Sequence, residues 1–403
     1  MLPVKEDGTK SAKNNKVKRA LVIAPSGWWG SVGDDALIRS TSTALRENGF
    51  EVFVLVNREH HKWQNALQQC GVSIICPSMI FTPQGIKMLL MIDDVYVIGA
   101  DIMDGGYDTK AITKRFTLAK ILRMFGKSIF VISFSFNKKP KKEVLQACKM
   151  LGKDAKYKVR DPRSLDRFKE ATGLSAECVA DVGFLTRAKN SSSIADFKSW
   201  ADHKRKKGFT LLLVNTSIGP FRSNPRTSHY SPDEVVDAIA VVLKELKRLH
   251  LPQLAIGIVP HDFRNSNKAW SDMALAEALH VRLKPDMDND IQIVPTPFDS
   301  PEMCAMAASS DLVITGRMHL AIISITAGVV PVSFTYQDKF EGMYEHVFDK
   351  SDKLMQPTDL LFDDPKAIAD QFKQILDARE GLCMEIAASR NQIIAKAMRN
   401  FTL

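Results

Sequence analysis

The sequence predicts an α/β protein of two lobes, each a doubly wound parallel sheet with helices on both faces, and a cleft between them. The chain has 403 residues, more than the roughly 100–200 residues of an average domain, which favours two domains. From residue 20 onward, short β-branched segments alternate with helical patterns, as in repeated βαβ units. Ligands of such sheets bind at the carboxyl ends of the strands, so we expect the site in the interlobe cleft.

The first lobe is expected to occupy residues 20–190. Two of its segments show helical signals: residues 34–47 have apolar side chains near helical spacing, and residues 140–151 begin with proline and are followed by glycine. The predicted strands are short and rich in β-branched residues, at 20–24, 51–56, 73–77, 94–100, 128–134 and 157–161.

Residues 191–207 are expected to be an inter-domain linker, because this stretch is rich in serine and basic residues. The second lobe, residues 208–403, then repeats the alternation. Its predicted strands lie at 209–215, 253–260, 291–295, 311–316 and 330–334. Its predicted helices are 232–249 with Ser231 as N-cap, 300–309, and two closing helices within 365–399.

The composition is that of an ordinary globular protein, with 45% hydrophobic and 25% charged residues, which excludes disorder throughout. Lys and Arg exceed Asp and Glu by 55 − 46, giving a net charge of +9. This charge indicates an anionic partner without identifying it. A nucleic acid, a membrane surface and a phosphorylated metabolite are all anionic partners of this kind.

Residues 1–19 are predicted to be a basic flexible tail, since they lack the apolar core of a secretory signal. The tail is expected either to be solvated or to contact an anionic membrane. The six cysteines include no C-x-x-C pair and no zinc spacing, so we expect mostly buried thiols in a reducing, cytoplasmic compartment and no metal site.

The longest stretch without Asp, Glu, Lys or Arg is residues 318–337, which is long enough by count to span a membrane. His319, Gly328 and Pro331 interrupt it. We therefore predict a buried helix followed by a buried strand.

The most informative segment for chemistry surrounds Gly316, where an apolar strand ends and an almost wholly apolar helix begins. Arg317 and His319 fall in the first turn of that helix, beside free backbone N–H groups at its positive end, which makes an anion site. The alternative is that Arg317 pairs with a structural carboxylate and His319 is a satisfied core histidine. The anion site requires both side chains to face the cleft without being locked to an acidic neighbour.

Two further segments follow strands of the second lobe and should reach the same edge. Lys339 is either another cation of the site or a solvated loop charge. His261 either contacts a sugar or phosphate or belongs to a turn.

In the first lobe, a glycine-rich segment follows the opening strand and leads into a helix. Gly33 allows close approach of a ligand to the backbone, and Asp34 and Asp35 each serve either as helix N-cap or as base for an acceptor hydroxyl. Trp29, with Trp28, offers an apolar face to a sugar ring or packs in the core. The segment lacks the lysine of a P-loop and fits GxGxxG poorly, so it is a weak signal for nucleotide binding.

Eight short motifs follow one another along the chain. They are Val32-Gly-Asp-Asp-Ala-Leu, Val97-Ile-Gly, Val159-Arg-Asp-Pro-Arg-Ser, Ala180-Asp-Val-Gly, Val259-Pro-His, Gly316-Arg-Met-His-Leu-Ala, Ala327-Gly-Val-Val-Pro-Val and Tyr336-Gln-Asp-Lys. Taken in this order, they resemble the polysaccharide pyruvyl transferase family. The resemblance covers the chain from about residue 20 to residue 342, and the Arg-x-His block is its specific part.

The resemblance implies two Rossmann-like lobes arranged as in glycosyltransferase-B enzymes. It implies transfer of pyruvate from phosphoenolpyruvate to a sugar residue of a glycan or lipid-linked saccharide as a cyclic ketal, with release of phosphate. It also implies a cytoplasmic enzyme, at the inner face of the membrane if it contacts one, with no metal, cofactor or nucleic acid. The implied catalytic residues are His319, Asp34 and Asp35, and the implied substrate-binding residues are Arg317, Arg222, Lys339, His261, Gly316, Gly33 and Trp29.

The sequence departs from the family pattern at three places. Ser31 stands where the first loop often has asparagine, Ala100-Asp101 replaces part of a glycine-rich loop, and Asn215 ends a strand that often carries arginine. Arg222 is the candidate replacement for that cation. Two other functions stay open: a nucleotide-sugar-dependent glycosyltransferase of the same architecture, and a binding protein without activity.

Overall fold

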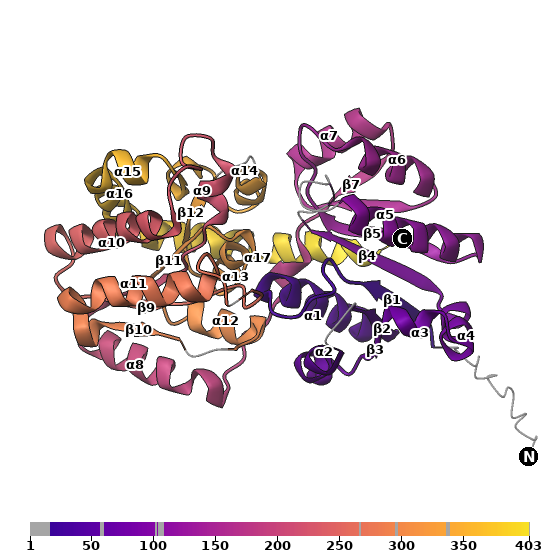
Figure 1. Cartoon of the computed structure of the whole chain (residues 1–403), viewed down its shortest axis with the longest axis horizontal. Coiled ribbons are helices and arrows are strands. Elements are labelled where there is room, and N and C mark those ends of the chain that lie inside the picture. Colours follow the sequence, from indigo (N-terminus) through magenta and orange to yellow (C-terminus); the bar gives the residue numbers. More distant parts are fainter. Residues whose placement is uncertain are drawn as a thin grey trace, which may run out of the picture.

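The computed structural model describes residues 17–56, 60–100, 103, 109–265, 267–294, 297–335 and 339–402. Most of the predicted basic tail, residues 1–16, lies outside this range. The described residues form two lobes, each built on a parallel sheet covered by helices (Figure 1). The strand orders are β3-β2-β1-β4-β5-β6-β7 and β10-β9-β8-β11-β12-β13. In both sheets the order reverses beside the first strand, which is the doubly wound topology, and the predicted fold class is confirmed.

Eleven of the strands match predicted segments, and the edge strands β7 and β13, of three residues each, were not predicted. The first sheet consists of β1 Arg19–Ile23, β2 Glu51–Leu55, β3 Ser73–Ile75, β4 Asp94–Ala100, β5 Ser128–Phe134, β6 Lys156–Val159 and β7 Ala176–Cys178. The second consists of β8 Thr210–Val214, β9 Leu254–Ile258, β10 Ile291–Ile293, β11 Leu312–Thr315, β12 Pro331–Thr335 and β13 Met355–Pro357.

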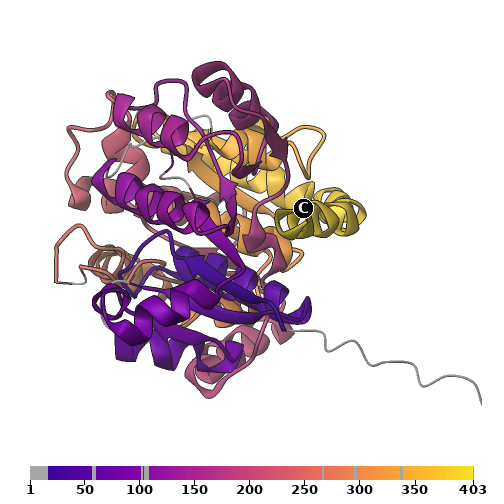
Figure 2. The same ribbon diagram turned by 90° about the vertical axis from the view of Figure 1, so that its right-hand side faces the viewer.

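Helices connect the strands and cover both faces of each sheet (Figure 2). Those of the first lobe are α1 Val32–Glu47, α2 His60–Leu67, α3 Pro77–Ile80, α4 Pro83–Met91, α5 Thr109–Met124, α6 Lys142–Leu151 and α7 Pro162–Thr172. Those that follow are α8 Ala195–Lys206, α9 Gly219–Ser223, α10 Pro232–Leu249, α11 Asp272–Met287, α12 Ser300–Ala307, α13 Met318–Thr326, α14 Lys339–Tyr344, α15 Leu360–Asp363, α16 Pro365–Asp377 and α17 Arg379–Met398.

The central strands are apolar throughout because both faces of each sheet are buried. Along β1, Ala20 and Val22 pack into the core under α1 and α2, whereas Leu21 and Ile23 pack into the core under α4 and α5. Such strands read as continuous β-branched runs, which is why the sequence revealed them.

The segment 318–337 folds as predicted over its described part, with α13 and β12 both buried. No helix in the described part of the chain is long and apolar enough to cross a membrane.

The predicted linker differs from the structure. Within 191–207, residues 195–206 form α8, and Ile194, Phe197 and Ala201 pack in the core of the second lobe. These apolar residues recur at helical spacing, while the polar and basic residues that suggested a linker lie mostly on the exposed side of the helix.

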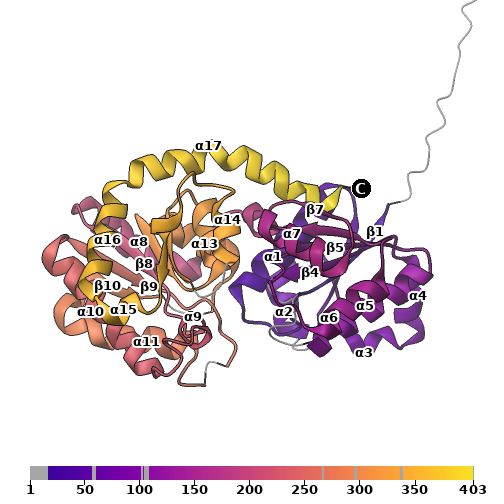
Figure 3. The ribbon, with the colours of Figure 1, turned by 90° about the horizontal axis from the view of Figure 1, so that it is seen from above.

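The last helix, α17, links the lobes again. Ile386 and Ile393 pack in the second-lobe core, and the chain then crosses to the first lobe, where Phe401 lies 6.0 Å from Tyr96, ring centroid to ring centroid. Figure 3 shows α17 lying across both lobes. The expected second domain, 208–403, therefore ends on the first lobe.

Candidate active site

A cavity of about 1800 Å³ lies between the lobes, at the carboxyl ends of the central strands. Its polar wall combines residues of both lobes, as expected for two doubly wound sheets that face each other. Where the lobes meet, these residues include Ser26, Ser31 and Asp34 from the first lobe and Ser217, His261, Arg264, Arg317 and His319 from the second. Further along the first lobe, Lys110, Lys114 and Arg115 of α5 and Glu143 of α6 line the same cavity.

The loops after β1 and β9 meet at this cavity. Ser31 and Asp262 form an antiparallel β-bridge, and the Phe263 N–H donates to the Gly30 carbonyl at 2.7 Å. Gly30 has a φ of +121°, and a Cβ there would lie 3.1 Å from the Arg264 nitrogen. Glycine is required because another residue would be strained and would crowd the second lobe.

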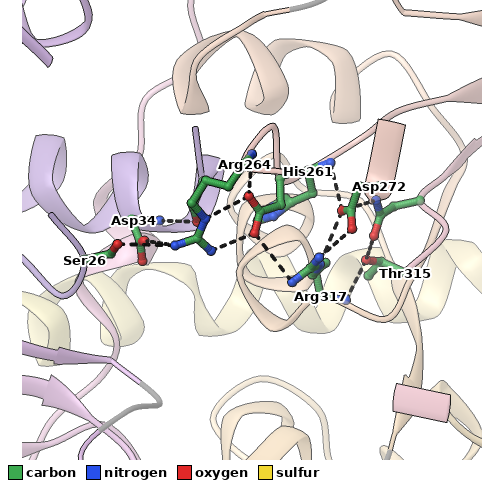
Figure 4. Close-up of polar contacts among 10 residues, drawn as sticks. Ser26, Asp34, His261, Arg264, Asp272, Thr315 and Arg317 are labelled. Atoms are coloured by element: carbon green, nitrogen blue, oxygen red, sulfur yellow. Dashed lines mark hydrogen bonds and ion pairs between the residues drawn. The ribbon is translucent and has the colours of Figure 1, made fainter. Parts of the chain in front are cut away.

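Arg317 is the N-cap of α13 and lines the cavity with 33% of its side chain exposed. Its Nη2 lies 2.5 Å from Asp272 Oδ1 and its Nε lies 3.3 Å from Oδ2, while Nη1 lies 4.0 Å from Asp262 (Figure 4). The expectation that Arg317 would not be locked to an acidic neighbour is wrong, so Arg317 does not meet the condition that the sequence set for the anion site. Its side chain nevertheless faces the cavity, which was the other half of that condition. The buried Asp272 carboxylate needs a counter-charge, and Arg317 supplies it. The two bonds of this pair also fix the plane of the guanidinium.

His319 lies in the first turn of α13 and also lines the cavity. Its Nε2 is buried, has no hydrogen-bond partner within the described part of the chain, and lies 3.8 Å from Asp181 Oδ2. Asp181 is itself held by Arg160 at 2.8 Å and by the Gly183 N–H at 2.7 Å. His319 is therefore not a satisfied core histidine, and its ring nitrogen faces a carboxylate fixed by an arginine.

His261 follows β9 and is 3% exposed. Its backbone N–H donates to Asp272 Oδ2 at 3.2 Å, and its ring nitrogen Nε2 has no hydrogen-bond partner in the described structure. Burial, with the charges of Arg317 and His319, holds the pKa of His261 well below 6.5. The ring is thus neutral at pH 7.

Arg264 joins the lobes across the cavity wall. It forms a fork with Asp262, with Nη2–Oδ2 at 2.6 Å, and its Nη1 lies 3.3 Å from both Asp34 and Ser26 (Figure 4). Although burial raises the pKa of Asp262, the hydrogen bond from Arg264 lowers it below its ordinary value. Where the lobes meet, the wall thus presents Arg264, Arg317, His261, His319 and Asp34. The carboxylates of Asp262 and Asp272 pair with the two arginines without lining the cavity themselves.

The two aspartates at the start of α1 have separate surroundings. Ser31, not an aspartate, is the N-cap, and its Oγ accepts from the Asp34 N–H at 3.2 Å. Asp34 lines the cavity. Asp35 is buried, binds Arg39 at 2.8 Å and accepts from the Ser300 hydroxyl at 2.7 Å. Asp35 therefore holds the lobes together away from the cavity wall, and nothing in its geometry supports the predicted role as a base.

Gly33 and Gly316 serve close packing. A Cβ on Gly33 would lie 2.8 Å from His319 Nδ1, and one on Gly316 would lie 2.6 Å from Pro220 Cγ. Gly33 therefore makes room for His319, whereas the sequence suggested that it makes room for a ligand.

The other predicted residues fall in different places. Trp28, not Trp29, lines the cavity, and Trp29 packs against the first-lobe core. Arg222 lies outside the cavity wall, with its guanidinium carbon 5.4 Å from the centre of the Trp270 ring. The side chain of Lys339, together with Asp101 and residues 336–338, lies outside the described residues.

Sequence reasoning missed Arg264, Asp262 and Asp272 as parts of the site. Asp262 and Arg264 lie one and three residues after His261, in the loop that follows β9, so extending the search along that loop would have found them. Asp272 lies 45 residues from Arg317 at the start of α11, and no local pattern connects the two.

Similarity to known proteins agrees with this architecture. The family model of polysaccharide pyruvyl transferases matches residues 32–338. No curated protein is significantly similar to this chain in sequence.

Solved structures share the fold at low identity. MnaA of S. aureus with UDP has a TM-score of 0.57 and 13% identity, over 94% of this chain and 95% of that one. UDP-GlcNAc 2-epimerase of Neisseria meningitidis, bound to UDP-GlcNAc, has a TM-score of 0.53 and 9% identity, over 95% and 100%. UGT2 of Phytolacca americana, with UDP-2fluoro-glucose and pterostilbene, has a TM-score of 0.51 and 11% identity, over 96% and 99%. With a family match over most of its length and the glycosyltransferase-B-like fold of two Rossmann-like lobes, this chain belongs to the polysaccharide pyruvyl transferase family.

Proposed function

We propose that the protein transfers the pyruvyl group of phosphoenolpyruvate to two hydroxyls of one sugar residue, forming a cyclic ketal and releasing phosphate. The observation that carries the proposal is the pair Arg317 and His319 at the start of α13, in the wall of the interlobe cavity of a family member. Phosphoenolpyruvate has a phosphate and a carboxylate. An arginine and the first turn of a helix are the groups that bind such anions.

The donor is placed on the second-lobe side of the cavity. No side chain caps α13 in the described structure, and the Leu320 N–H donates to the Arg317 carbonyl at 3.1 Å. The Met318 and His319 N–H groups are therefore the first-turn donors proposed for a phosphate oxygen. Arg317 stands beside them, held by Asp272, and the buried Ser217 hydroxyl lies in the same wall. Lys339 stays a candidate further cation.

The acceptor is placed on the first-lobe side. Trp28, 46% exposed, offers an apolar face to a sugar ring, and Asp34 lies in the wall nearby. The acceptor is a glycan or a lipid-linked saccharide.

In the proposed mechanism, His319 acts as the acid that protonates the methylene carbon of phosphoenolpyruvate. Positive character then develops at C2, and one sugar hydroxyl adds there. The C2–O bond to phosphate breaks, and the second hydroxyl closes the ketal while Asp34 accepts a proton. The two sugar hydroxyls together release two protons. One restores the proton that His319 gave to the new methyl group, and the other leaves with the phosphate. The proposed steps change no oxidation state, and the proposal includes no metal or cofactor.

Phosphate release by the full chain tests the proposal. With phosphoenolpyruvate and a galactosyl or mannosyl acceptor, we expect release that depends on the acceptor and a product heavier by one pyruvate less one water. The three proteins of similar fold named above were solved with UDP or a UDP-sugar, so UDP-sugars are the competing donors to test. Turnover with a nucleotide sugar alone would replace this proposal by a glycosyltransferase, and binding without turnover of either donor would leave a binding protein.

Single substitutions at Arg317, His319 and Asp34 test the roles proposed for these residues. Arg317→Ala and His319→Ala should each lower phosphate release by about 10²-fold or more, because each removes a group that binds or protonates the donor. Asp34→Asn should lower turnover with little change in KM for phosphoenolpyruvate. The control is Arg226→Ala, since Arg226 is an exposed arginine of the second lobe that pairs with Asp359. Normal rates in the Arg317 and His319 variants would refute their assignment.

A further inference from the structure

The face of the first lobe formed by α3, α4 and α5 exposes an unusual number of large apolar side chains. Of the seventeen such side chains in the described structure, eight lie in these helices and the loop residues that follow α3 and α5. They include Phe81 at 85% and Met124 at 76% exposure. The eight are Met79, Phe81, Ile86, Leu90, Met91, Ile121, Met124 and Phe125. We call this surface the α3–α5 face, and Figure 3 shows its helices on the side of the molecule opposite α17.

The α3–α5 face is continuous with the active-site cavity. The same cavity that contains Arg317 and His319 extends along the first lobe to Ile86, Ile121 and Phe125. Large exposed apolar surfaces of this kind mark interaction sites in otherwise soluble folds. The site therefore opens toward the α3–α5 face, and whatever covers this face lies next to the entrance of the acceptor side.

The charge of this face has one sign. Residues 77–92 and 109–127 contain seven Lys or Arg and no Asp or Glu, namely Lys87, Lys110, Lys114, Arg115, Lys120, Arg123 and Lys127. The lysines Lys87, Lys110 and Lys114 are exposed. Acids at the edge of the face include Asp93, which follows α4 and accepts from the Arg19 N–H, Glu143 of α6, which also lines the cavity, and Asp154, which pairs with Arg123.

We infer that the α3–α5 face docks on an anionic lipid bilayer, with Phe81, Met124 and Phe125 inserted among the acyl chains and the lysines on the headgroups. Apolar side chains interspersed with lysine, without acids, form the pattern of interfacial membrane contact. Docking in this way opens the cavity toward the membrane surface, where lipid-linked saccharides lie.

Three other occupants fit this face less well. A second copy of the chain on a two-fold axis would bring lysines against lysines. A protein partner would have to bury several lysines, which are depleted in protein interfaces. A nucleic acid would use the cations and leave the apolar side chains without a role.

Vesicle co-sedimentation of the full chain tests the inference. We expect binding to phosphatidylcholine–phosphatidylglycerol vesicles and weak binding to phosphatidylcholine alone, with the difference reduced by salt. Phe81→Gln with Phe125→Gln should lower the partition coefficient by about tenfold or more. Lys87→Gln with Lys114→Gln should lower it roughly fivefold for each lysine. The matched control is Val281→Gln with Met384→Gln, which removes exposed apolar side chains from α11 and α17.

All substituted side chains are exposed, so thermal unfolding should be unchanged and a loss of binding can be assigned to the surface. Three results would overturn the inference. The first is the absence of vesicle binding by the wild type. The second is equal binding by the wild type and the Phe81/Phe125 variant, because the basic tail would then be the part that contacts the membrane. The third is a dimer in solution that the Phe81/Phe125 variant dissociates without any vesicle binding.

Discussion

At the scale of single residues, the site is a row of alternating charges. Arg264 lies between Asp34 and Asp262, and Arg317 lies between Asp262 and Asp272 (Figure 4). Each guanidinium is held in a fixed plane at the cavity wall, so less side-chain entropy is lost when a ligand binds. Burial, together with the positive charges of Arg317 and Arg264, lowers the pKa of His261 and leaves its ring uncharged at neutral pH.

The buried His261 predicts how stability depends on pH. The pKa of His261 is held well below its ordinary 6.5 by burial and by the charge of Arg317. Below pH 6.5 the unfolded chain takes up a proton at this residue and the folded protein does not. Stability is therefore fully present above that pH and falls as the pH drops below it, by up to about 1.4 kcal/mol per pH unit from this group.

Urea unfolding of the wild type and His261→Gln between neutral pH and mildly acidic pH measures this contribution. The wild type should lose stability faster than the variant as the pH falls. Burial also lowers the pKa of His346, so both proteins keep a common dependence from that residue. Identical pH slopes in the two proteins would contradict the assignment to His261.

At the scale of elements, the contact between α1 and α13 positions the proposed catalytic histidine. Gly33 in the first turn of α1 lies against the His319 ring in the first turn of α13. The two helices come from different lobes, and their amino-terminal ends meet because each follows a central strand of its sheet. The absence of a side chain at Gly33 thus sets where the imidazole can lie.

Gly33→Ala should displace the His319 ring, because the new Cβ would lie 2.8 Å from Nδ1. A displacement of about 1 Å at a catalytic group can lower turnover by about 10²-fold. We expect that loss in acceptor-dependent phosphate release, with a smaller effect on thermal unfolding. Gly381→Ala in α17 is the control, since nothing lies within 4 Å of its Cβ, and it should keep full activity. Full activity in Gly33→Ala would show that this packing does not position the histidine.

At the scale of the whole molecule, the chain passes between the lobes twice, and its last residues close the structure. Buried Asn400 accepts from the Ser133 N–H at 3.1 Å and donates to the Ala180 carbonyl at 2.9 Å. These bonds fix the end of α17 to the first lobe after the helix has crossed from the second (Figure 3). The cavity is therefore bounded by lobes that are tied together at the β-bridge of Ser31, at Asp35 and at Asn400.

Asn400→Ala should destabilise the fold by roughly 1–3 kcal/mol, because it leaves the Ser133 N–H and the Ala180 carbonyl buried without this partner. The free energy of unfolding in urea measures the loss. Thr402→Ala, an exposed change two residues later, should stay within about 0.5 kcal/mol of the wild type. Equal stability of the two variants would mean that the carboxyl-terminal contact does not hold the lobes together.

The sequence by itself determined the two doubly wound sheets and the start of α13. Strands buried on both faces are continuous apolar runs, and an arginine and a histidine at the beginning of an apolar helix stand out against it. Both are local patterns, so they can be found without knowing any contact. For the same reason the N-cap Ser231 and the buried segment 318–337 were predicted correctly over the described residues.

Only the tertiary structure decided which charges meet. Asp272 with Arg317, Arg264 with Asp34, and Asp35 with Ser300 join residues that are 45, 230 and 265 positions apart. Asp34 and Asp35 are neighbours in the first turn of α1 and point in different directions. Which of them faces the cavity and which faces the other lobe depends on how the two lobes pack, and sequence spacing does not contain that information. The position of α17 across both lobes and the burial of α8 also depend on long-range contacts. In both cases an apolar helix face packs on a core that exists only in the folded lobe.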